Sequence, residues 1–107
     1  MKRACWLLLA ALSAAACGAS AVPQPTAADA SRGIAHFPDL TLSELSRGRT
    51  LYVSRCGSCH ALKRPAELSP ERWQIEVAEM RNKNGVKLSD SDAQAIARYL
   101  SVAAGAG

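Results

Sequence analysis

The sequence lacks the features that define several large classes of protein. It has only one Phe, seven Gly and five Pro in 107 residues, which excludes collagen-like and low-complexity chains. It has no run of 18 apolar residues, so a protein with several membrane-spanning helices is excluded. No stretch alternates apolar and polar residues in the manner of a half-buried strand. The absences leave one small helical domain as the expected architecture.

A strong charge of either sign is also missing. The formal net charge is +4, but two of the cations, Lys2 and Arg3, lie in a segment that we expect to be removed. The remainder carries 11 Lys and Arg against 9 Asp and Glu, and it has no basic stripe with interleaved aromatic residues. These features exclude nucleic acid as the expected partner. A domain this small usually needs a disulfide, a metal or a cofactor to stabilise it.

The N-terminus has the pattern of an export signal. Met1, Lys2 and Arg3 form a positive region, and the apolar stretch 4–16 is too short to span a bilayer. Cleavage after Ala21 would give a signal peptide of residues 1–21 and a soluble periplasmic protein. Alternatively, residues 14–17 resemble a bacterial lipobox, which would give a signal peptide of residues 1–17 and a lipidated Cys17. We favour the second interpretation, because an incidental Cys is a poor choice in an oxidising compartment.

Residues 18–40 have the composition of a linker. They contain Ala, Ser and three of the five Pro residues, and show almost no apolar periodicity. Pro23 and Pro25 favour an extended backbone around them, so this segment is predicted to be a tether between a membrane or signal and the folded domain. The part from Ile34 to Phe37 is expected to dock on the domain, because Phe37 is the only Phe.

Three helices are predicted, each from its N-terminal capping pattern. Thr41, Ser69 and Ser89 stand at the expected N-caps, and Pro70 follows Ser69 at the first helical position. The predicted helices cover residues 42–56, 70–84 and 90–103, and Gly85 is a suitable left-handed residue after the second of them. Apolar residues share one face of the third helix, at positions 93, 96, 99, 100 and 103.

The chemistry of the chain is concentrated in Cys56-Gly57-Ser58-Cys59-His60. This C-x-x-C-H pattern is the covalent attachment site of c-type haem, in which two thiols bind the haem vinyl groups and the histidine is the proximal iron ligand. A thioredoxin-like dithiol would require a βαβ context, which is missing here. A zinc site would require a fourth ligand, for which only His36 remains, and a simple disulfide is the third alternative. We favour haem, because haem is attached outside the cytoplasm and the chain carries an export signal.

Residues 41–103 resemble the class I-type cytochrome c domain. The similarity lies in Gly48-x-x-x-Tyr52-x-x-x-Cys56 and in the C-terminal helix around Tyr99. The pattern Trp73-x-x-x-Val77-x-x-Met80 resembles that of the compact bacterial subgroup. The resemblance implies an all-α, small cytochrome c fold over residues 41–107, with three main helices around one covalently bound haem c. It also implies that Gly48 packs against Tyr99.

Met80 is the favoured sixth ligand of the haem iron. It is the only Met outside the signal segment, and it lies on an apolar stripe with Trp73 and Val77. An ordinary core role is the alternative, since Met on such a stripe usually packs in the core. His36 is the second candidate ligand, and the remaining ones are Lys63, Lys83, Lys87 or an open position.

Several further residues are candidates for contacts with the haem. The carbonyl of Pro65 is expected to orient His60 through its Nδ1 atom. The indole of Trp73 is expected either to reach a haem propionate or to anchor the core, and Arg81 either to pair with a propionate or to be solvated. Five basic residues surround these segments and form either a docking surface for an acidic redox partner or an ordinary charged surface: Lys63, Arg64, Arg81, Lys83 and Lys87.

The sequence therefore predicts an exported monohaem c-type cytochrome that carries single electrons between periplasmic or membrane redox proteins. It is expected to be a carrier and not an enzyme, because two axial ligands would leave no open position on the iron. A five-coordinate haem protein that binds a gas or peroxide is one alternative. The other is a haem subunit of a larger dehydrogenase or oxidase.

Overall fold

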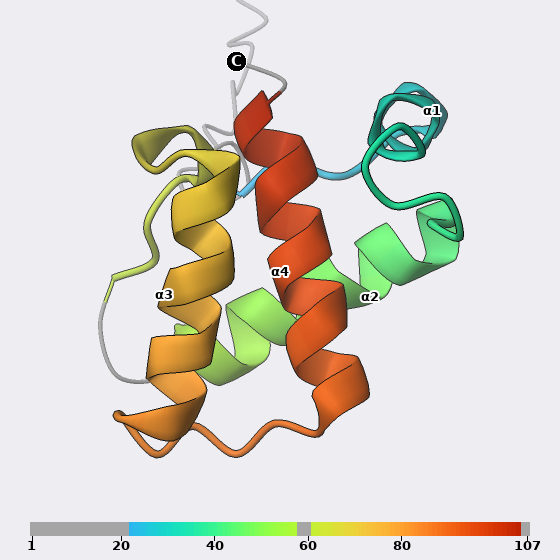
Figure 1. Cartoon of the computed structure of the whole chain (residues 1–107). Coiled ribbons are helices and arrows are strands. Elements are labelled where there is room, and N and C mark those ends of the chain that lie inside the picture. Colours follow the sequence, from blue (N-terminus) through green and yellow to red (C-terminus); the bar gives the residue numbers. More distant parts are fainter. Residues whose placement is uncertain (1–21, 58–60, 106–107) are drawn as a thin grey trace, which may run out of the picture.

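The structure, a computed structural model, describes residues 22–57 and 61–105. Within these ranges the chain forms helices and no strand, so the all-α prediction is confirmed (Figure 1). The helices follow one another as α1 (Ala27–Gly33), α2 (Leu42–Leu51), η1 (Tyr52–Cys56), η2 (Pro65–Glu67), α3 (Pro70–Asn82) and α4 (Asp90–Gly105). Of these, η1 is a short π-helix and η2 a short 3₁₀-helix.

The three predicted helices begin where their caps predict. The side-chain oxygens of Thr41, Ser69 and Ser89 each accept a hydrogen bond, at 3.1 Å, from the backbone N–H three residues later. α2 and η1 together cover the first predicted helix, α3 ends two residues before the predicted end, and α4 runs two residues past it. Gly85 has a φ of +70°, as expected of the left-handed residue that follows α3.

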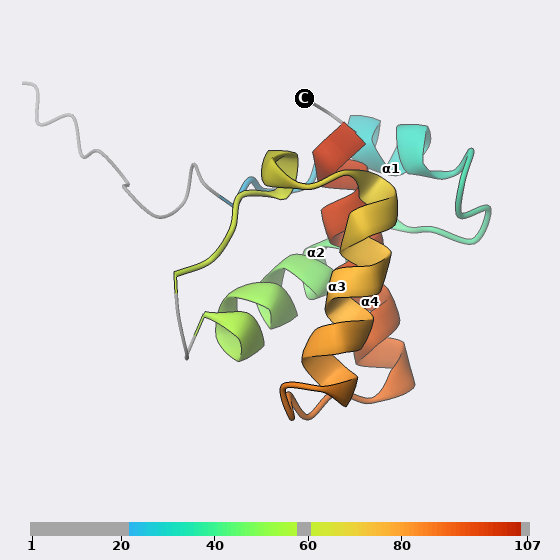
Figure 2. The same ribbon diagram turned by 60° about the vertical axis from the view of Figure 1, so that its left-hand side comes forward.

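The helices pack around a crossing between α2 and α4. α3 and α4 run antiparallel, and α2 with η1 passes across the pair (Figures 1 and 2). At the crossing a Cβ on Gly48 would overlap the carbonyl oxygen of Ala95 and would come within 2.8 Å of Tyr99 Cβ. The predicted contact between Gly48 and Tyr99 is confirmed, and it explains a glycine in the middle of a helix, where it costs about 1 kcal/mol relative to Ala.

The predicted apolar faces form the core. Ile96 and Leu100 of α4 are completely buried, and Tyr99 is 1% exposed. Trp73 of α3 is also 1% exposed and lies in the same core cluster, whereas Ile75, which lies off the apolar stripe, is 49% exposed. α3 therefore presents one face to α4 and leaves Ile75 at the surface.

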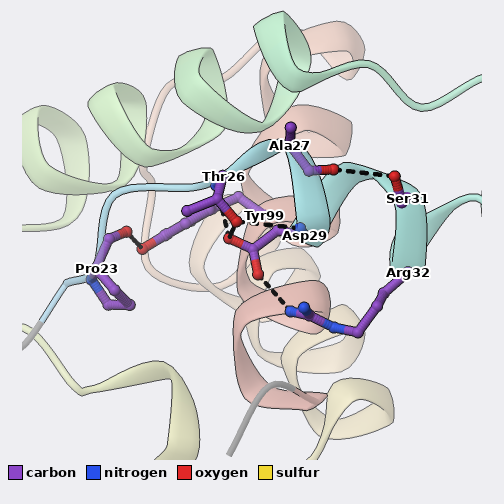
Figure 3. A network of polar contacts seen from close by, with 7 residues as sticks. All are labelled: Pro23, Thr26, Ala27, Asp29, Ser31, Arg32 and Tyr99. Atoms are coloured by element: carbon purple, nitrogen blue, oxygen red, sulfur yellow. Dashed lines mark hydrogen bonds and ion pairs between the residues drawn. The ribbon is translucent and has the colours of Figure 1, made fainter.

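The prediction of a tether is wrong for residues 22–40, which we call the N-terminal segment. Thr26 caps α1 in a capping box with Asp29, so the segment contains a helix of its own (Figure 3). Val22 is 3% exposed, and its carbonyl accepts a hydrogen bond from Arg49. The hydroxyl of Tyr99 donates to the carbonyl of Pro23 at 2.6 Å. These contacts hold the segment against α2 and α4.

Phe37 docks on the domain as predicted. It is partly buried against the core cluster, and the guanidinium of Arg98 lies 5.0 Å from the centre of its ring. Arg98 also pairs with Glu44 at 2.8 Å and with Asp39 at 3.2 Å. Ile34 does not dock, since it is 48% exposed. The segment is therefore joined to α2 and α4 through Arg98 as well as through buried side chains.

Candidate functional site

The first cysteine of the attachment motif stands at the end of a helix. Cys56 is the last residue of η1 and is 5% exposed. Gly48, Tyr52 and Cys56 are four residues apart and all buried, so they share the face of this helix that points to the core. Cys59 and His60 lie outside the described residues. The crossing of α2 with α4 therefore fixes the position from which the motif begins.

Tyr52 links this helix to the segment that follows the motif. Its hydroxyl donates to the carbonyl of Lys63 at 2.7 Å. Its ring packs edge to face on Trp73, with ring centres 5.9 Å apart. Burial raises the pKa of Tyr52, so the hydroxyl keeps its proton and remains a donor. Sequence reasoning missed this role, because the pattern shows an aromatic residue but not the partner of its hydroxyl.

Pro65 and Trp73, both expected near the haem, bond to each other. The indole N–H of Trp73 donates to the carbonyl of Pro65 at 2.7 Å, and both residues are buried. Of the two roles expected for Trp73, the structure shows the core anchor, because its single N–H is bonded within the protein. The Pro65 carbonyl also accepts the N–H of Leu68 at 3.4 Å, so both of its lone pairs already have donors within the protein. The contact expected between this carbonyl and His60 stays a prediction, because His60 lies outside the described residues.

Met80 lies near the C-terminal end of α3, partly buried against the core. Its carbonyl accepts the N–H of Val86 at 3.2 Å, which folds the chain back after the helix. Arg55 of η1 donates to the carbonyl of Lys87 at 3.1 Å, so the segment after α3 contacts the helix that carries Cys56. The end of α3 and the end of η1, which carries Cys56, are therefore on the same side of the protein. Ligation of iron by Met80 stays a prediction.

His36, the second candidate ligand, lies elsewhere. It is exposed in the turn between α1 and α2. α2 and η1 together are roughly 20 Å long at a rise of 1.5 Å per residue. Cys56 stands at the end of them that is farther from this turn. The turn and the end of η1 are on opposite sides of the molecule in both views (Figures 1 and 2). His36 instead lines a cavity of about 590 Å³ with Gly33, Phe37 and Val102.

The candidate basic residues differ in how they are paired. Arg81 pairs with Asp90 at 2.6 Å, and Lys83 lies 3.7 Å from Glu79. Lys63, Arg64 and Lys87 are exposed. Arg55, Arg81 and Lys87 line an open hollow of about 580 Å³ between η1 and the segment after α3. Arg81 is thus ion-paired, and its contact with a propionate stays a prediction. Cys17 lies outside the described residues.

The residues around the motif suit a covalently attached haem. A buried thiol ends η1, and Val53, one turn earlier, is 42% exposed. Leu62 and Val86 are half-buried, so apolar side chains stand on both sides of the motif in the sequence. A porphyrin is a large apolar plane that such side chains can cover. Within residues 22–57 and 61–105, no three His, Cys, Asp or Glu side chains gather as a metal site would require.

The helix crossing at Gly48, together with the C-x-x-C-H motif that α2 and η1 lead into, defines a c-type cytochrome. A family model described as dihaem cytochrome c matches residues 52–106, just over half of the 107 residues. The chain belongs to the dihaem cytochrome c family. This description names two haems, whereas the sequence resemblance implied a monohaem domain. Neither a curated protein nor a solved structure matches the chain.

None of the helices in the described part of the chain has the length and apolar character needed to cross a bilayer.

Proposed function

We propose that this chain binds one haem c, through Cys56 and Cys59, and carries single electrons. The observation that supports one haem is the single C-x-x-C-H motif in a sequence with four cysteines, of which Cys5 and Cys17 lie in the signal segment. The second haem that the family description names would then belong to a part outside these 107 residues or to a partner. Haem iron, when bound, supplies a reversible one-electron couple whose potential depends on its axial ligands.

The protein's own residues have separate tasks in this proposal. The thiols of Cys56 and Cys59 hold the group, and His60 is the proximal ligand. Cys56, which is buried at the end of η1, would hold the group close to the core. Met80 is the sixth ligand, and its neutral thioether favours the ferrous state and raises the reduction potential. With His60 and Met80 both bound to it, the group would supply electron transfer and leave no position for a substrate.

Replacement of Met80 tests the carrier proposal against the gas-binding alternative. Ferric wild-type protein is expected to show the weak sulfur-to-iron charge-transfer absorption and, when reduced, to bind carbon monoxide poorly. Met80→Ala is expected to remove the band, open the sixth position to carbon monoxide and lower the potential. Ile75→Ala, an exposed change on the same helix, is the control and should leave all three properties intact. Rapid carbon monoxide binding by wild type would instead support a sensor or catalytic haem domain.

The proposed location is the periplasmic side of a bacterial membrane, with a lipid on Cys17. Cys17→Ser should then release the haem protein from membranes or block its processing, with an unchanged haem spectrum. Cys5→Ser, in the same signal segment, is the matched control and should leave attachment intact. A mature protein that begins at Val22 would favour the soluble form.

The proposed partners are acidic redox proteins that dock near the motif. Lys63, Arg64 and Lys87 are exposed there and would steer such a partner. The association rate should fall as salt rises, because the Debye length shortens to about 8 Å at physiological ionic strength. Replacement of Lys63 and Lys87 by Gln should weaken that salt dependence. An unchanged salt dependence would favour an ordinary charged surface.

A further inference from the structure

Two hydrogen bonds hold the backbone directly after the haem motif. We call residues 61–68 the post-motif segment; it starts at the residue after His60. The hydroxyl of Tyr52 donates to the carbonyl of Lys63, and the indole N–H of Trp73 donates to the carbonyl of Pro65, each at 2.7 Å. The two acceptors are two residues apart, so the two donors bind one short stretch of backbone.

The two donors are buried, whereas most of the first half of the post-motif segment is exposed. Tyr52 is 2% exposed and Trp73 1%, and their rings pack against each other edge to face. In the stretch 61–64, in contrast, three of the four side chains are exposed, and only Leu62 is half-buried. Burial of side chains therefore contributes little to the position of this stretch. Hydrogen bonds from a fixed aromatic pair contribute more.

We propose that Tyr52 and Trp73 are positioning residues for His60: they fix the carbonyls of Lys63 and Pro65, and so set the path of the backbone that leaves the histidine. The proposal rests on the proposed function, in which His60 is the proximal ligand. The orientation of a ligating imidazole and the hydrogen bonds around it tune the metal. A looser post-motif segment would therefore change the electronic state of the iron as well as the local stability.

The chain supplies a matched control for the hydroxyl of Tyr52. Tyr99 is 1% exposed, burial raises its pKa to about 12, and its hydroxyl also donates to a backbone carbonyl, that of Pro23 (Figure 3). Pro23 belongs to the N-terminal segment. Tyr52→Phe and Tyr99→Phe therefore each remove one buried hydroxyl and one hydrogen bond, but only the first change lies beside the motif.

Hydrogen exchange and spectroscopy of the full-length haem protein test the proposal. The N–H groups of Arg64 and Glu67 report on the post-motif segment, because they bond to the Glu67 side chain and the Arg64 carbonyl respectively. Tyr52→Phe is expected to speed their exchange about five-fold, as loss of a typical hydrogen bond would. It should also move the reduction potential and the ferric electron paramagnetic resonance spectrum, which reports the imidazole orientation. Tyr99→Phe should leave all of these at wild-type values.

The outcomes separate this proposal from the proposed function. Faster exchange with an unchanged potential and spectrum would overturn the positioning role and leave Tyr52 a purely structural residue. Equal effects of Tyr52→Phe and Tyr99→Phe would also overturn it. A wild-type protein without covalent haem would refute the proposed function instead, while the exchange measurement would still show whether Tyr52 holds the post-motif segment. Trp73→Phe should speed exchange at Glu67 in the same way.

Discussion

The N-terminal segment and the post-motif segment are attached to the core in the same way but differ in what else supports them. In each, a buried tyrosine donates its hydroxyl to a backbone carbonyl: Tyr99 of α4 to Pro23 at 2.6 Å, and Tyr52 of η1 to Lys63 at 2.7 Å. The N-terminal segment adds its own capped helix and the buried side chains of Val22 and Leu40.

The post-motif segment has fewer supports of its own. Pro65 is its buried residue, and the stretch before it has mostly exposed side chains. Backbone ordering costs about 1–2 kcal/mol per residue, which a few hydrogen bonds barely offset. The comparison predicts that protein contacts suffice to order the N-terminal segment, whereas the post-motif segment, held chiefly by two hydrogen bonds, gains further order from the proposed haem.

The largest expected effect comes from removing both thiols. Cys56→Ala with Cys59→Ala should abolish covalent haem, because each thioether bond needs its sulfur. Hydrogen exchange should then quicken more in residues 61–68 than in α1, which keeps more of its protection. Haem stain on a denaturing gel and exchange mass spectrometry measure the two effects. Haem retained after acid–acetone extraction would refute the attachment, and equal loss of protection in both segments would refute the comparison.

Disruption of the helix crossing should remove the difference in hydrogen-exchange protection between the N-terminal and post-motif segments. Gly48→Val places side-chain atoms against the Ala95 carbonyl and Tyr99 Cβ. The free energy of unfolding should fall by roughly 3 kcal/mol, the upper range for overpacking, and both segments should lose protection. Chemical denaturation measures the change. Gly105→Ala, where a Cβ would meet nothing within 4 Å, should change stability by less than about 0.5 kcal/mol.

Loss of Arg98 should loosen the N-terminal segment alone. Its side chain is 13% exposed and pairs with Glu44 and Asp39. Arg98→Met should lower the free energy of unfolding by about 1.5–3 kcal/mol, as for hydrogen bonds between charged groups. Exchange should quicken near Phe37 and stay unchanged after the motif. Arg72→Met, which breaks an exposed pair with Glu76, should cost under about 1 kcal/mol.

The smallest expected effect is a pH dependence at Asp39. A hydrogen bond from Arg98 lowers the pKa of this exposed carboxyl below its usual value. A lowered folded-state pKa stabilises the fold above the unfolded value of about 3.9, and this stabilisation is lost as pH falls through the folded-state pKa. Asp39→Asn should therefore be slightly less stable than wild type at pH 7 and equal to it in strong acid. In an Arg98→Met background the difference should shrink, because a backbone hydrogen bond also lowers the pKa of Asp39.

The helices that surround the site were predictable because each begins with a capping pattern that is visible in the local sequence. Hydroxyl caps, Pro70 after Ser69 and the left-handed Gly85 depend on neighbours in the sequence, and all agree with the structure. α1 carried the same signal in Thr26-x-x-Asp29, but the flanking prolines favoured a linker. Local capping patterns therefore sufficed to predict the helices, including α1 if its pattern is taken into account.

The hydrogen bonds at the site were not predictable, because their partners are set by packing. Nothing in the pattern Trp73-x-x-x-Val77 shows whether the indole meets a propionate or the Pro65 carbonyl. The pairing of Arg81 with Asp90 likewise depends on how the chain turns after α3. The motif residues Cys56, Cys59 and His60 were recognisable because covalent haem attachment requires this residue spacing in the sequence.

The π-helix before the motif bears on how the chain tolerates changes in length. A π turn holds one residue more than an α turn, and η1 ends on Cys56. Deletion of one residue between Tyr52 and Cys56 can therefore be absorbed by conversion of η1 to a regular α-helix, which leaves the thiol close to its original face. The same deletion within α2 would rotate everything beyond it by about 100° and turn the thiol away from the core. A single-residue deletion should therefore disturb the position of the Cys56 thiol less in η1 than in α2.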